Sequence, residues 1–202
     1  MVDEQASGGR AQTAAAPRLD SLAAQLKDQA YPPVHKWDPP FCGDIDMRIA
    51  RDGTWYYMGS PIARPAMVKL FSRVLRRDGD GRIYLVTPAE KLGIQVDDAP
   101  FLVVEMESAG SGEDRALTFR TATDDVVVVD QDHPLWVEED PHTGEPSPYI
   151  HVRNGLNGLI NRAVFYDLAG LAIEEETGAG RKLGVWSNGS FFILAPAEEA
   201  RS

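Results

Sequence analysis

Apolar residues recur at helical spacing in two stretches of the chain. The first stretch begins at position 67 and the second at position 165, which is 98 residues later. In both stretches they occupy the i, i+3, i+4, i+7 and i+8 positions of one face, which predicts an amphipathic helix. The first set is Met67, Leu70, Phe71, Val74 and Leu75, and the second is Phe165, Leu168, Ala169, Ala172 and Ile173. Each helix follows an Ile-x-Arg motif and precedes a predicted strand, 83–86 or 183–186. We therefore expect a duplicated strand-helix-strand unit.

The first of these helices should begin at Pro65, because proline is well tolerated in the first helical turn. It should continue to about Arg77, where Asp78-Gly79-Asp80-Gly81 would end it. A further helical turn is expected over 87–91, with Thr87 as its cap.

Short apolar segments bounded by turn residues predict strands along the rest of the sequence. Hairpins are expected around Arg51-Asp52-Gly53 and around Asn188-Gly189. An antiparallel meander is expected over 101–107, 116–121 and 126–130. An acidic, proline-rich excursion follows at 131–148, and a strand at 149–152 then feeds the second helix through Arg153-Asn154-Gly155.

These elements predict an α+β fold of two similar subdomains, built from the repeated strand-helix-strand unit with antiparallel sheets. We place the first subdomain at residues 35–98 and the second at 99–202. Residues 1–34 would form a disordered tail, poor in apolar residues as far as Pro17, followed by a short helix. The apolar residues of that helix are Leu19, Leu22, Ala23 and Leu26.

The net charge limits the partners that the protein can bind, and the cysteine content limits its disulfides and metal sites. The 202 residues are 43% hydrophobic, enough to fill a core, and carry a net charge of −11. An acidic surface repels phosphate backbones, so we expect no nucleic-acid partner. The single cysteine, Cys42, excludes an intramolecular disulfide and a thiolate-rich zinc site. Since the chain shows neither a signal-peptide pattern nor a long apolar run, we expect a cytoplasmic protein without a membrane partner.

No pattern of catalytic or metal-binding residues emerges. The four histidines, at positions 35, 133, 142 and 151, show no i, i+4 pair on a predicted helix. Asp78-Gly79-Asp80-Gly81 begins like a calcium loop, but Arg82 and Ala89 occupy positions that need oxygen ligands. His35 is the only potential base near Cys42 in the sequence. We therefore predict no catalytic residue and no metal site, favour a protein that is not an enzyme, and assign no cofactor.

Several motifs between Pro33 and Leu194 are similar to those of a known bacterial family. They include Trp37-Asp38-Pro39, Gly43-Asp44-Ile45-Asp46, Asp52-Gly53-Thr54-Trp55, Gly59-Ser60-Pro61-Ile62-Ala63-Arg64 and Tyr84-Leu85-Val86-Thr87-Pro88. In these segments the chain resembles the family catalogued as domain of unknown function 1285. The resemblance implies an α+β fold with repeated structural motifs and a ligand-sensing or signalling role. It implies no catalytic residues.

Our main functional hypothesis is a regulatory or signalling protein that binds a small anionic ligand between its two halves. Arg64 and Arg162 stand at the starts of the two equivalent helices, where a guanidinium and the helix dipole both favour an anion. Alternatively, each arginine pairs with an acidic residue and fixes its own strand-to-helix corner. Together with Arg153, Trp37 and Trp55, they form the predicted ligand-binding set.

The alternative hypothesis is a protein-protein interaction module without a small-molecule ligand. Its contact surface would be the apolar trio Leu135-Trp136-Val137 in the acidic excursion, or the predicted helix over residues 19–26. Both hypotheses remain open at the level of the sequence.

Overall fold

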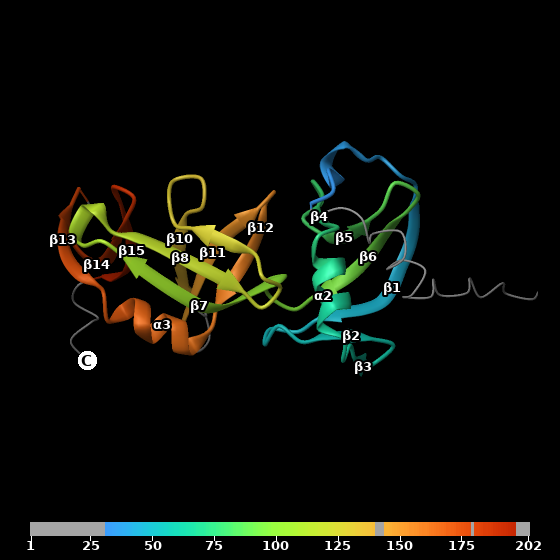
Figure 1. Ribbon diagram of the computed structural model, residues 1–202, viewed down its shortest axis with the longest axis horizontal. Helices are drawn as coiled ribbons and strands as arrows, with labels where there is room; N and C mark the ends of the chain where they lie inside the picture. The colour runs from blue at the N-terminus through green and yellow to red at the C-terminus, as the bar shows by residue number, and fades with distance from the viewer. Residues whose placement is uncertain (1–30, 140–143, 179, 197–202) are drawn as a thin grey trace, which may run out of the picture.

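The computed structural model describes residues 31–139, 144–178 and 180–196 (Figure 1). The predicted tail and the helix over 19–26 lie outside these residues, as does His142. The described chain forms two β-rich bodies that lie side by side along the longest axis of the molecule. The connection from β6 to β7 crosses between them.

The first half is a six-stranded mixed sheet with the order β3-β2-β1-β6-β5-β4. Strands β1 and β6 run parallel at its centre, and the other pairs are antiparallel. Helix α2 (Pro65–Ser72) leads from the edge strand β3 to the opposite edge strand β4. A short 3-10 helix, η1 (Val34–Lys36), precedes the sheet. The strands are β1 (Phe41–Ile49), β2 (Trp55–Tyr57), β3 (Ser60–Pro61), β4 (Leu75–Arg77), β5 (Ile83–Val86) and β6 (Lys91–Val96).

The second half repeats this strand order as β9-β8-β7-β12-β11-β10, again with a central parallel pair, β7 and β12. Helix α3 (Arg162–Ala169) follows β12 and leads to a separate sheet with the order β13-β14-β15. A 3-10 helix, η2 (Gly112–Asp114), lies between β7 and β8. The strands are β7 (Phe101–Ala109), β8 (Ala116–Thr121), β9 (Val126–Val128), β10 (Leu135–Glu139), β11 (Pro146–Arg153), β12 (Leu156–Ile160), β13 (Ile173–Thr177), β14 (Gly180–Ser187) and β15 (Ser190–Pro196).

The two halves are therefore similar, but the repeated unit is a six-stranded sheet and not the predicted strand-helix-strand unit. Helix α2 joins the third and fourth strands of its sheet, whereas α3 follows the sixth strand of its own. The two helices share a sequence pattern without occupying equivalent positions. The fold is mainly β, so the predicted α+β class was only partly right.

Both helices are also shorter than the apolar spacing predicts. Helix α2 ends at Ser72 and not near Arg77, and Leu75 already pairs with Leu85 as the first residue of β4. In the same way, Ile173 begins β13. The last apolar residues of each stretch are taken up by strands because edge pairing satisfies their backbone groups as well as a helix would.

The turn signals had mixed outcomes. Arg51-Asp52-Gly53 links β1 to β2, and Asn188-Gly189, with φ of 47° and 70°, links β14 to β15, as predicted. The helical turn over 87–91 was wrong, since Lys91 begins strand β6. Asn154 and Gly155, predicted to lead into a helix, instead form a hairpin turn with φ of 50° and 74° between β11 and β12. The acidic excursion contains β10 and the start of β11.

Buried side chains from both halves belong to one hydrophobic cluster. Phe71 on α2, Phe101 on β7 and Leu168 on α3 are among its most deeply buried members. None of the helices in the described part of the chain combines the length and the hydropathy needed to cross a bilayer.

Candidate functional site: a pocket between the two halves

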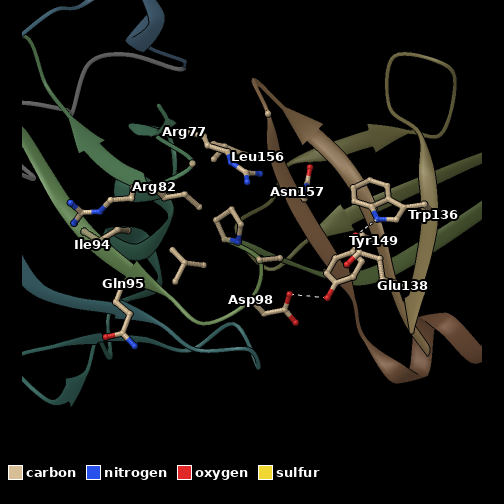
Figure 2. A pocket seen from close by; sticks show the side chains of 16 residues that line it. Arg77, Arg82, Ile94, Gln95, Asp98, Trp136, Glu138, Tyr149, Leu156 and Asn157 are labelled. Atoms are coloured by element: carbon tan, nitrogen blue, oxygen red, sulfur yellow. Dashed lines mark hydrogen bonds between the residues drawn. The ribbon is translucent and has the colours of Figure 1, made fainter. Parts of the chain in front are cut away.

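A pocket of about 540 Å³ lies where the two halves face each other (Figure 2). Strands β4, β5 and β6 supply one wall, and β10, β11 and β12 supply the other. The segment Asp98-Ala99-Pro100, which connects the halves, lies between the walls. The volume is in the range that small-molecule sites occupy.

The first wall carries two arginines, Arg77 and Arg82, that differ in their polar partners. Arg77 is the last residue of β4 and lies two positions after the buried Leu75, so the alternation of the strand places both on one face. Figure 2 shows the Arg77 guanidinium extending toward the second half. In the described part of the chain, no residue accepts a hydrogen bond from it or pairs with it.

Arg82 also lines the pocket, but its charge is compensated. Its Nη2 donates to Oδ1 of Asp44 at 2.5 Å, and its guanidinium lies 5.3 Å from the ring centre of Tyr84. The hydrogen bond to Asp44 raises the pKa of Arg82. In Figure 2 its guanidinium is turned away from the second half. Arg77 is therefore the arginine of this wall whose positive charge is available to a ligand.

The second wall is aromatic and acidic. Trp136 on β10 and Tyr149 on β11 are directly paired across the strands, and their rings stack with centroids 5.7 Å apart at 25°. Trp136 Nε1 donates to Oε1 of Glu138 at 2.8 Å, which orients the indole. Glu138 lies on the same face as Trp136, two residues further along β10. Aromatic rings and a carboxylate thus face the guanidinium of Arg77 across the pocket.

Asp98 ties this wall to the first half. The Tyr149 hydroxyl donates to Oδ1 of Asp98 at 2.8 Å, and Nη1 of Arg51 lies 3.1 Å from Oδ2. Oδ2 of Asp98 is buried. It forms an ion pair with Arg51, but no described residue donates a hydrogen bond of suitable geometry to it. Burial and then the hydrogen bond to Asp98 raise the pKa of Tyr149 to about 12. Since Arg51 Nη2 also donates to Ser147 Oγ at 2.7 Å, these residues fix the two walls relative to each other.

A second polar contact between the halves lies around Arg153. Arg153 Nη1 pairs with Asp125, and Nη2 donates to the carbonyl oxygen of Ser72 at 2.8 Å. The guanidinium lies 4.6 Å from the ring centre of Phe101 and 5.3 Å from that of Tyr31. Burial lowers the pKa of Arg153, and Asp125 acts in the opposite direction. The structure therefore gives Arg153 a role in joining the halves.

The five residues of the predicted binding set are dispersed. Trp55 is 3% exposed in the core, and Trp37 is half-buried, with its carbonyl oxygen accepting a hydrogen bond from Arg76 at 2.7 Å. Arg64 is exposed at the N-cap position of α2. None of the five belongs to the described residues that line the pocket between the halves. Their contact with a ligand stays a prediction.

Arg162 lines a different pocket, of about 420 Å³, beside α3. Its Nε donates to the hydroxyl of Tyr166, one turn further along the helix, at 3.2 Å. Arg51 also lines this pocket. Of the two helix-start arginines, Arg162 is thus held by an aromatic neighbour on its own helix.

Sequence reasoning missed Arg77, Glu138, Tyr149 and Asn157 as pocket residues, and placed Trp136 in the acidic excursion as part of a candidate protein-contact surface. The available signal was the pattern of 135–139 and 146–150, which pair residue by residue as a hairpin. Recognising that hairpin would have placed Trp136 beside Tyr149 on one sheet face. Within the described ranges, no cluster of three or more His, Cys, Asp or Glu side chains is arranged to hold a metal ion.

Comparisons with known proteins agree with this two-part architecture. The family model described as the N-terminal domain of DUF1285, a domain of unknown function, matches residues 32–99, and the corresponding C-terminal domain matches residues 100–194. No curated protein matches the chain.

Two crystal structures are similar to this chain. A DUF1285 family protein from Silicibacter pomeroyi DSS-3 is 52% identical, with a TM-score of 0.86, and the match covers 93% of this chain and 100% of that one. A DUF1285 family protein from Shewanella baltica OS155 is 27% identical, with a TM-score of 0.49, over 62% of this chain and 91% of that one. The two family models and the 52% identical structure confirm the resemblance detected in the sequence motifs.

Proposed function

Because this chain belongs to the DUF1285 family, whose domains are described as being of unknown function, we propose its function from the pocket between its own halves. The protein binds a small molecule with an anionic group in this pocket. It acts as a cytoplasmic regulatory or signalling protein. A ligand that touches both walls would bias the arrangement of the halves, which is the physical basis of ligand-dependent regulation.

The observation that carries the proposal is the guanidinium of Arg77. It extends into a pocket of about 540 Å³ and has no polar partner among the residues that the structure describes. Arginine presents a planar fork of donors that matches a carboxylate or a phosphate. The stacked Trp136 and Tyr149 supply the apolar surface typical of such sites.

A thermal-shift screen of nucleotides and organic acids against the purified full chain tests the proposal. A ligand present at 100 times its Kd should stabilise the protein by about 2.7 kcal/mol. We expect Arg77→Ala to abolish this stabilisation and Arg181→Ala to preserve it. Arg181 is an exposed arginine on β14 that does not line the pocket. A ligand that stabilises the wild type and the Arg77 variant equally would refute the proposal.

A second candidate, a protein-protein interaction module, is favoured by the outer face of the three-stranded sheet. Ile173 and Ile193 flank Gly184 in register and are 43% and 44% exposed. Trp186 and Phe191 stand beside them with ring centroids 5.4 Å apart. Exposed apolar patches of this kind often mark contact surfaces. The apolar trio at 135–137 fits this role less well, because Leu135 is buried and Trp136 lines the pocket.

Pull-downs from a bacterial lysate distinguish this candidate. If the sheet face binds a protein, Ile193→Asp should remove that protein from the eluate. Val126→Asp is the matched control, because Val126 is 66% exposed on β9, in a different sheet. Equal capture by both variants and the wild type would argue against a contact through this face.

A further inference from the structure

The two walls of the pocket carry uncompensated charges of opposite sign. Arg82 is paired with Asp44, and Asp98 with Arg51. Arg77 remains on the first wall and Glu138 on the second. No described residue forms an ion pair with either of them, and they do not pair with each other across the pocket. A cation and an anion thus face the same cavity from opposite sides.

Glu138 stands in an environment suited to an ammonium group. Its Oε1 accepts the indole N–H of Trp136 at 2.8 Å, and no described residue donates a hydrogen bond to Oε2. The Trp136 and Tyr149 rings lie next to it on the same face of the sheet. A carboxylate beside aromatic rings attracts ammonium ions through both charge and cation–π interaction. The second wall therefore favours the positive end of a ligand.

The first wall favours the negative end. The guanidinium of Arg77 can donate two parallel hydrogen bonds to a carboxylate. A ligand with anionic groups at both ends would place one of them against Glu138 and be repelled there. Asn157 on β12 also lines the pocket, and its amide offers an NH₂ group as donor and a carbonyl oxygen as acceptor to a ligand.

We propose that the ligand of this pocket is a zwitterion of the amino-acid class, with its carboxylate at Arg77 and its ammonium group at Glu138. The inference rests on the proposed function and deepens it, since it assigns to the ligand a positively charged group in addition to the anionic group. Binding would connect the two halves through one molecule.

Isothermal titration calorimetry of the full chain tests this assignment with the twenty proteinogenic L-amino acids and glycine betaine as probes. Each amino acid that binds is compared with its desamino acid and its decarboxylated amine; for phenylalanine these are 3-phenylpropanoate and 2-phenylethylamine. We expect at least one probe to bind, and both of its analogues to bind at least tenfold more weakly.

Two variants and one matched control complete the test. Arg77→Gln and Glu138→Gln should each weaken the binding probe at least tenfold. Glu139→Gln should leave it unchanged, because Glu139 is the next residue on β10, is exposed, and faces the opposite side of the strand. Circular dichroism and melting temperature of the unliganded variants establish that each has folded.

The outcomes separate this inference from the function on which it rests. If an acid without an amino group binds as well as its amino acid, and only Arg77→Gln weakens it, the zwitterion is refuted while the anion-binding function stands. If none of the probes binds, the zwitterion is refuted and the thermal-shift screen decides the wider function. If binding survives Arg77→Gln, both are refuted.

Discussion

Arg153 on β11 donates a hydrogen bond from Nη2 to the carbonyl oxygen of Ser72, the last residue of α2, at 2.8 Å. The bond crosses from the second half of the molecule to the first. Because Arg153 also pairs with Asp125 in its own half, one guanidinium joins the two bodies. The arrangement that forms the pocket between the halves therefore depends on a largely buried guanidinium with defined partners.

We predict that Arg153→Met destabilises the protein strongly. Removing one partner of a buried pair leaves the other charge without compensation, at a cost of about 3–5 kcal/mol. The free energy of unfolding in urea measures the effect. Arg48→Met is the matched control, since Arg48 pairs with Asp97 at an exposed position and should contribute far less. Equal losses for the two variants would contradict the assigned role.

The second prediction concerns the turn at one edge of the pocket. Gly155 has φ of 74°, and a Cβ atom at this position would meet no other atom within 4 Å, so Gly155→Ala would suffer from backbone strain and not from a clash. We expect a loss of about 1–2 kcal/mol in the free energy of unfolding. Gly79→Ala, at a turn position that is also open and has no positive φ, should be close to neutral. Similar values for both variants would refute the strain argument.

The same turn shows why the fold was only partly predictable. Asn188-Gly189 was recognised because apolar runs flank it on both sides, whereas Asn154-Gly155 was assigned to a helix lead-in. The short strand β12 that follows it has two buried faces and no clear alternation. Without β12, the parallel pair at the centre of the second sheet could not be foreseen.

The internal repeat illustrates a different limit. Helical spacing is easy to detect in a sequence, and it suggested that α2 and α3 are equivalent. In the structure the two helices occupy different positions in the order of strands of their halves. The real repeat is an order of strands, which leaves only weak sequence periodicity. The candidate site had the same difficulty, because Trp55 and Trp136 both lie in strands and only the tertiary fold decides that one is buried and the other lines a pocket.

The third prediction uses the acidic turn between β4 and β5. Asp78 accepts hydrogen bonds from Arg76 and Lys91. Both bonds lower the pKa of Asp78 below its usual 3.8, and the bond from Arg76 has the larger effect. A lowered pKa in the folded state means that the carboxylate stabilises the fold above pH 3.8 and loses this effect as the pH falls through the folded-state pKa. Asp78→Asn should therefore reduce the free energy of unfolding at pH 7. The difference from the wild type should shrink below pH 3.8, and a constant difference would contradict this account.

The last prediction concerns Tyr149, whose hydroxyl donates to Asp98 where the halves meet. Tyr149→Phe should cost about 1.5–3 kcal/mol at pH 7, because the bond is made to a charged acceptor that would remain buried. The raised pKa of about 12 sets the pH window. A tyrosine that titrates at 10 when unfolded and at about 12 when folded stabilises the fold fully below pH 10, and this contribution is lost as the pH rises toward 12. Denaturant unfolding of both proteins between pH 7 and pH 12 measures it. The two curves should converge above pH 10, and curves that stay parallel would show that the hydroxyl contributes through packing alone.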